Sequence, residues 1–164
     1  MNNNNHQDAC NLPQRRRLPH GIPAWVPDDA VHFVTINCAE RGKNQLCESS
    51  VAEIFKESLL HRQKLGHLWM RLCLLMPDHI HLLASFSRNH GMKGVIAKWK
   101  EWTAKQTGIR WQTDFFEHRL RRDESFEEKA HYIRMNPVRK GLVARPEEWP
   151  YVWDSNTFGD FRGW

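Results

Sequence analysis

The sequence predicts an α+β fold in which one antiparallel β-sheet carries helices on one face. Four segments have the alternating or continuous apolar residues that are typical of strands: residues 30–39, 67–76, 79–86 and 111–120. Three segments have helical periodicity: residues 49–66, 92–107 and 123–135. The resulting order, β-α-β-β-α-β-α, is that of a ferredoxin-like sandwich. The last strand is the least regular and is either a strand or a short bend.

The first strand and the first helix are joined by a polar turn. Residues 30–39 alternate between two faces, as strand residues do. The run Arg41-Gly42-Lys43-Asn44 is typical of a turn. Ser49 or Ser50 is placed to cap the helix that follows, which we expect to stop near Gly66.

The second and third strands are predicted to form a hairpin around Pro77-Asp78, with two histidines at the start of its second arm. Alternate side chains of a strand share a face, so His79 and His81 point the same way while Ile80 points into the core. Two adjacent imidazoles near water are a ready pair of metal ligands. The alternative is a pair of histidines that binds nothing.

The second predicted helix follows Gly91 and ends at Gly108, and it interleaves tryptophans with lysines. We expect Trp99 and Trp102 to face the core. The lysines of the same helix would then form a basic face suited to nucleic-acid phosphates: Lys93, Lys98 and Lys100.

The third predicted helix begins near Asp123-Glu124-Ser125, where two acidic residues suit the positive end of a helix dipole. It ends before Asn136-Pro137, because the residue before a proline disfavours helical geometry. We expect Asn136 to close the helix.

The chain is predicted to have three parts. Residues 1–27 form an irregular basic arm that contains Arg15, Arg16 and Arg17, and these are candidates for following a phosphate backbone. Residues 28–144 form the folded domain. Residues 145–164 are rich in aromatic side chains, so we expect this tail to pack on the body or on a ligand.

Composition limits the class of protein. With 164 residues, 40% of them hydrophobic, the chain can build one core. No apolar run approaches the roughly 20 residues that a membrane helix needs. The four cysteines form no C-x-x-C pair, which indicates neither a zinc site nor a disulfide framework and fits a cytoplasmic setting. The net charge of +5 favours a polyanionic partner, with nucleic acid first.

Three blocks of sequence resemble the single-tyrosine HUH transposases, and among these the REP-associated tyrosine transposases of bacteria. The blocks are Leu75-Met76-Pro77-Asp78-His79-Ile80-His81-Leu82-Leu83, Trp111-Gln112-x-x-Phe115-Phe116-Glu117-His118, and Tyr132-Ile133-Arg134-Met135-Asn136-Pro137-Val138-Arg139-Lys140-Gly141-Leu142-Val143. Glu147-Glu148-Trp149-Pro150-Tyr151 also fits. The blocks stand in the order and spacing of that family between residues 30 and 154.

The resemblance implies an HUH fold and a metal-dependent endonuclease and transposase that acts on single-stranded DNA carrying hairpins. In the family a tyrosine hydroxyl attacks a backbone phosphate and leaves a 5′-phosphotyrosine link and a free 3′-OH. It implies Mg²⁺ or Mn²⁺ bound by His79 and His81. For the third ligand, His118 is the first choice and Glu117 the second choice. Asp78 could orient one of the two histidines. The resemblance also implies a bacterial, nucleoid-associated protein that acts as a monomer rather than a dimer.

One position departs from the family pattern. The nucleophile is expected in the second block, where this chain has Phe115, which has no hydroxyl. Three explanations stand: Phe115 replaces the nucleophile and the chain cannot cleave; Phe116 is the position under a shift of one residue; or Tyr132 is the nucleophile. The first is our prediction.

Two other classes of function stay open. One is a DNA hairpin-binding protein without catalysis. The other is a small metal-dependent hydrolase, which the lack of acidic residues clustered near His79 and His81 disfavours.

Overall fold

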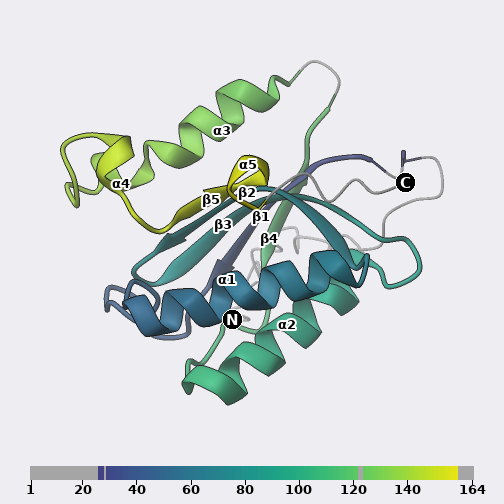
Figure 1. Ribbon diagram of the computed structural model, residues 1–164, viewed down its shortest axis with the longest axis horizontal. Helices are drawn as coiled ribbons and strands as arrows, with labels where there is room; N and C mark the ends of the chain where they lie inside the picture. The colour runs from purple at the N-terminus through teal and green to yellow at the C-terminus, as the bar shows by residue number, and fades with distance from the viewer. Residues whose placement is uncertain (1–25, 28, 122–123, 159–164) are drawn as a thin grey trace, which may run out of the picture.

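The computed structural model describes residues 26, 27, 29–121 and 124–158. They form one five-stranded antiparallel sheet in the order β4-β1-β3-β2-β5 (Figure 1). The strands are β1 His32–Asn37, β2 Leu68–Met76, β3 His79–Phe86, β4 Phe116–Arg119 and β5 Val152–Asp154. The helices are α1 Ser49–Lys64, α2 Met92–Thr107, α3 Phe126–Arg134, α4 Asn136–Arg139 and α5 Ser155–Phe158, with the 3-10 turn η1 Pro146–Glu148. In the described part of the chain, no helix has both the length and the apolar character to cross a bilayer.

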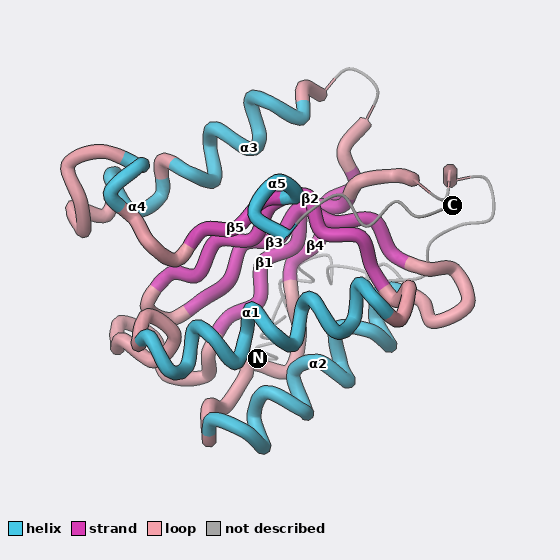
Figure 2. The backbone as a smooth tube through the Cα atoms, viewed as in Figure 1, coloured by secondary structure: helices cyan, strands magenta, loops and turns pink. Residues whose placement is uncertain are grey.

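The larger core lies between the sheet and the pair α1 and α2 (Figure 2). Val34 and Ile36 of β1 face this side, and Phe55 of α1 and Trp99 of α2 pack edge to face at 6.0 Å. The buried Trp99 donates its indole N–H to Ser58 Oγ at 2.7 Å, so its polar atom is satisfied. Trp102, which we expected to face the core as well, is instead 40% exposed.

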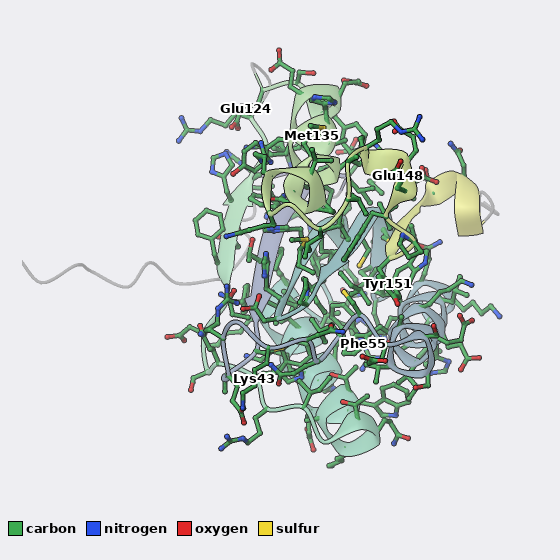
Figure 3. All side chains as sticks on the ribbon, turned by 90° about the vertical axis from the view of Figure 1, so that its left-hand side faces the viewer. Lys43, Phe55, Glu124, Met135, Glu148 and Tyr151 are labelled. Atoms are coloured by element: carbon green, nitrogen blue, oxygen red, sulfur yellow. The ribbon has the colours of Figure 1, made fainter. Side chains whose placement is uncertain are left out.

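The opposite face of the sheet is also apolar, and α3 covers it. The side chains buried there come from β1, β2, β3, α3 and the segment before β5: Phe33, Leu72, Leu74, Met76, Leu83, Ala130, Ile133 and Trp149. Figure 3 shows Phe55 of α1 and Met135, at the end of α3, on opposite sides of the sheet. The predicted α+β class with an antiparallel sheet and helices is confirmed, but the placement of every helix on one face was wrong. Strands that are apolar on both faces need cover on both.

The two edges of the sheet differ from the sequence prediction. The strand predicted over residues 111–120 is limited to Phe116–Arg119, preceded by an isolated bridge between Cys38 and Trp111. At the other edge β5, which was not predicted, pairs with β2. Just before β5, Trp149 donates its indole N–H to the Leu75 carbonyl at 2.9 Å. Residues 149–154 thus extend the sheet that carries the histidine pair.

Candidate active site

The two histidines lie side by side on the face of the sheet that α3 covers. In the β1–β3 ladder, His79 stands opposite Asn37 and His81 opposite Thr35, while Ile80 between them faces the α1 and α2 core. The imidazole centroids are 4.7 Å apart, with the rings at 83° to each other. Strand alternation therefore brings both rings to one place at the start of β3.

Each imidazole is held through its Nδ1 atom. His79 Nδ1 lies 2.6 Å from Asp78 Oδ1, and His81 Nδ1 lies 3.0 Å from Thr35 Oγ1. With Nδ1–H donated to these oxygens, the lone pair of each ring is on Nε2. This is the arrangement found behind metal-bound histidines, where an oxygen partner fixes the tautomer and the ring orientation.

Burial keeps both rings neutral. It lowers the pKa of His81 to about 3, and the nearby His79, Arg139 and Arg41 act in the same direction. The pKa of His79 is also lowered by burial, although the bond to Asp78 opposes this shift. Neutral imidazoles are the form that binds a metal ion, so both rings are prepared as ligands near pH 7.

Asp78 is itself fixed by the loop after β1. Its carboxylate accepts the Gly42 backbone N–H at 2.7 Å and lies 3.3 Å from Arg41 Nε. Burial alone would raise the pKa of Asp78, but the hydrogen bonds from Gly42 and His79 and the charge of Arg41 hold it below its ordinary value. An ionised Asp78 is thus available to orient His79, as the sequence analysis had considered.

Positive side chains border the histidines. Arg41, Arg139 and Lys140 each lie near enough to lower the pKa of one or both rings. Sequence analysis did not assign them, although Arg139 and Lys140 stand in the third block of the resemblance. The concentration of charge makes this corner of the sheet suited to a phosphate group.

Tyr132 stands on α3 beside the same charges and is 50% exposed. The Arg139 guanidinium lies 4.1 Å from the Tyr132 ring centroid, and Arg139 also donates to the Tyr132 carbonyl. Lys129 Nζ lies 5.8 Å from the Tyr132 ring and 5.4 Å from the Phe33 ring. Phe33 in turn packs on His81, with centroids 5.5 Å apart. A continuous series of contacts therefore joins Tyr132 to the histidine pair.

Tyr151, the second tyrosine of the chain, is half-buried at the other edge of the sheet. Its ring packs edge to face on Trp149 at 5.4 Å.

The structure does not bring Phe115 to the histidines. Phe115 packs against the core on the α1 and α2 side of the sheet and lines a small cavity with Ile96, Ala97 and Lys100 of α2. Placing the nucleophile position at Phe115 therefore conflicts with the structure, because the sheet lies between this side chain and the histidine pair. Phe116 is on the histidine side, 56% exposed and 5.9 Å from the Phe33 ring, but it also lacks a hydroxyl.

Neither predicted third ligand joins the pair. His118 faces the α3 side, but strand β1 separates it from β3, and its Nε2 is 2.8 Å from Glu124 Oε1. Glu117 points to the other face, where its Oε2 lies 3.3 Å from His32 Nδ1. No group of three His, Cys, Asp or Glu side chains that could hold a metal occurs among the residues described.

The predicted DNA-binding cations are not at this site. Lys93, Lys98 and Lys100 all belong to α2, on the opposite face of the sheet. Lys100 is engaged locally, donating to the Gln112 carbonyl at 2.6 Å and the Thr113 carbonyl at 2.9 Å. Arg15, Arg16 and Arg17 lie outside the described residues.

Comparison with known proteins identifies relatives of the chain. No family model matches the sequence. A REP-associated tyrosine transposase of Haemophilus influenzae is 29% identical over 141 residues, which cover 74% of this chain and 77% of the relative. A REP-associated tyrosine transposase of Escherichia coli is 23% identical over 124 residues, 73% of each chain. The chain is a homologue of the REP-associated tyrosine transposases.

The fold of these transposases is also the fold of this chain. The solved structure of a REP-associated tyrosine transposase bound to a REP hairpin superposes with a TM-score of 0.68 at 20% identity. The superposition covers 86% of this chain and 82% of that one.

Proposed function

We propose that the chain is a DNA-processing enzyme of the REP-associated transposase type, which cuts and rejoins single-stranded DNA beside a hairpin with Tyr132 as its nucleophile. The observation that carries the proposal is the position of Tyr132. Its half-exposed ring lies near both Lys129 and Arg139, on the helix that covers the sheet face carrying His79 and His81.

We propose hairpin DNA as the substrate because of what a solved homologue binds. The solved homologue is bound to a REP hairpin. In this chain, the cations around the histidines would bind a phosphate of a single DNA strand that enters between α3 and the sheet.

The histidine pair fits a divalent metal ion. Both Nδ1 atoms have oxygen partners, so both Nε2 atoms are left for Mg²⁺ or Mn²⁺. Such an ion would polarise the scissile phosphate and offset its negative charge. These ions prefer oxygen ligands, and Asn136 at the start of α4 is our candidate for one. Its amide N–H group is engaged by the Ile133 carbonyl at 3.0 Å, which leaves its Oδ1 for another partner.

The tyrosine step is a displacement at phosphorus. The Tyr132 oxygen forms a bond to the phosphorus atom and its proton passes to water. The bond from phosphorus to the 3′ oxygen breaks, and the departing 3′ oxygen takes up a proton from water. The products are a 5′-phosphotyrosine and a free 3′-OH. Arg139 and Lys129 would hold the phosphate and offset its negative charge. Attack of a 3′-OH on the phosphotyrosine reverses the step and joins strands.

A gel assay of covalent adducts tests the proposal. The chain is incubated with Mn²⁺ and hairpin DNA that has single-stranded flanks, then run under denaturing conditions. The unchanged chain is expected to give a shifted, protease-sensitive band, and Tyr132→Phe to give none. Tyr151→Phe is the matched control and should keep the band. If the unchanged chain binds the hairpin but forms no adduct, it is a hairpin-binding protein without catalysis.

A further inference from the structure

A second cavity lies between α1 and α2, on the face of the sheet away from the histidine pair. Its volume is about 470 Å³, within the range of small-molecule sites. Most of its polar lining is basic or imidazole: His61, Arg62, His67, His90 and Lys98. Nothing in the proposed cleavage chemistry uses these residues.

Arg62 is the unusual member of the lining. It is only 9% exposed, and within the described residues its side chain donates one hydrogen bond, a long contact of 3.5 Å to the Ser58 carbonyl. Glu57 is the sole carboxylate among the described residues that line the cavity, and it forms no ion pair with Arg62. A buried guanidinium without a counter-ion is costly, so an anion in the cavity would relieve the cost.

Further donors surround the same space. The His67 and His90 rings lie 4.2 Å apart. Burial lowers the pKa of His67, and so do the charges of His90, Arg62, Lys98 and His61. Among the described residues that line the cavity, the basic and imidazole groups thus outnumber the single carboxylate of Glu57, a balance that favours binding of a phosphate.

The cavity also has an aromatic wall. Trp102 of α2 lines it and is 40% exposed, and Leu65 beyond the end of α1 is 53% exposed. Exposed indole rings are platforms on which nucleobases stack. Phosphate-binding and base-stacking groups therefore face one cavity of suitable size.

We infer that the cavity between α1 and α2 binds a nucleotide unit, with its phosphate held by Arg62, Lys98 and the histidines and its base stacked on Trp102. The nucleotide is either free in solution or part of a single DNA strand. The site is separate from the histidine pair, because α1 and α2 cover the opposite face of the sheet.

Ligand-observed NMR on the full chain tests the inference, with adenosine 5′-monophosphate as the probe. Binding of the monophosphate should exceed that of adenosine and that of inorganic phosphate. Replacing Lys98→Gln together with His90→Gln should weaken it about tenfold, the scale of a lost charged hydrogen bond. Trp102→Ala should weaken binding of the monophosphate and leave binding of inorganic phosphate unchanged.

A matched control separates the site from general charge. Lys64→Gln removes one exposed positive charge from α1 outside the cavity and should change binding less than about twofold. A 5′-phosphorylated tetranucleotide that displaces the monophosphate identifies a DNA strand as the ligand, and failure to displace it identifies a free nucleotide. The inference is overturned if neither probe binds saturably, or if Lys64→Gln weakens binding as much as the cavity variants do.

Discussion

Thr35 and Asp78 set the chemistry of the two histidines through one repeated contact, an oxygen at Nδ1. That His79 and His81 lie on one face could be predicted from the sequence, because a strand residue points to one of two faces and residues two apart share a face. The partner of His81 could not, because Thr35 comes from β1, which is distant in the sequence and adjacent only in the sheet.

Metal binding should depend on the two histidines of β3, His79 and His81. Calorimetry with Mn²⁺ should find one ion for the unchanged chain and none for His79→Ala combined with His81→Ala. Thr35→Val should weaken binding by about tenfold, since loss of the oxygen behind a ligand frees the ring. The matched control is His67→Ala with His90→Ala, a histidine pair on the other side of the molecule. Loss of the ion in that control alone would place the metal elsewhere.

His32 should make the fold sensitive to acid. It is 4% exposed, and its Nε2 atom has no hydrogen-bond partner in the described part of the chain. Burial lowers its pKa, although Glu117 opposes the shift. Below about pH 6.5 the unfolded chain therefore binds a proton more readily than the folded one, so this contribution to stability is present above that pH and is lost as the pH falls.

Urea unfolding at pH 7.5 and pH 5.0 measures the effect of His32. The loss of unfolding free energy on going from pH 7.5 to pH 5.0 should be smaller in His32→Phe than in the unchanged chain. His131→Gln, at an exposed site on α3, is the control and should keep the full loss. An equal loss in His32→Phe would show that His32 does not carry the acid sensitivity.

At the scale of one residue, the nucleophile position expected from the second block does not meet the histidine pair in the structure. The second block placed the attacking position at Phe115, and no pattern in the sequence says on which face an edge residue lies. In the structure Phe115 packs under the sheet against α2. Tyr132, left as an alternative, is the tyrosine beside the cations that flank the histidines.

At the scale of elements, α3 was predicted in place but not in orientation. Its start and end follow from local signals: Ser125 accepts the Glu128 backbone N–H at 3.2 Å, and the helix ends just before Asn136-Pro137. The sheet face that α3 covers is not set by local sequence. Because β1, β2 and β3 are apolar on both sides, either face could accept the helix, and tertiary packing decides between them. Strand β5 was missed because three residues are too few for a periodic signal.

Removing the α3 cap should cost measurable stability. Ser125→Ala is expected to lower the free energy of unfolding by about 1 kcal/mol, because the Glu128 N–H loses its acceptor. Ser49→Ala, at the start of α1 where no side chain caps the helix, should cost less than about 0.5 kcal/mol. Chemical unfolding of both variants measures the difference, and equal costs would mean that the Ser125 bond contributes nothing.

At the scale of the whole molecule, the two faces of the sheet carry different sets of charged and polar side chains. The α3 face carries the histidine pair, Tyr132 and the cations that border them, whereas the lysines predicted to bind DNA lie on the α2 face. Sequence analysis identified a basic protein but could not assign its charges to faces.

The salt dependence of hairpin binding should distinguish the faces. The double variant Lys129→Gln and Arg139→Gln should reduce the slope of log affinity against log salt by about 1.4 to 1.8, since each phosphate contact contributes about 0.7 to 0.9. Lys93→Gln with Lys64→Gln removes the same charge from the other face and should leave the slope nearly unchanged. Fluorescence anisotropy over a salt series gives both slopes, and a larger change in the second pair would put the hairpin on the α1 and α2 side.

Mapping the DNA-linked peptide tests the central claim most directly. The unchanged chain is reacted with hairpin DNA and Mn²⁺, digested with nuclease and trypsin, and analysed by mass spectrometry. Cleavage after Lys129 and Arg134 isolates residues 130–134, and the nucleotide mass is expected on this peptide, at Tyr132. The chain has only one other tyrosine, Tyr151, so a nucleotide on the peptide that contains Tyr151 would contradict the account.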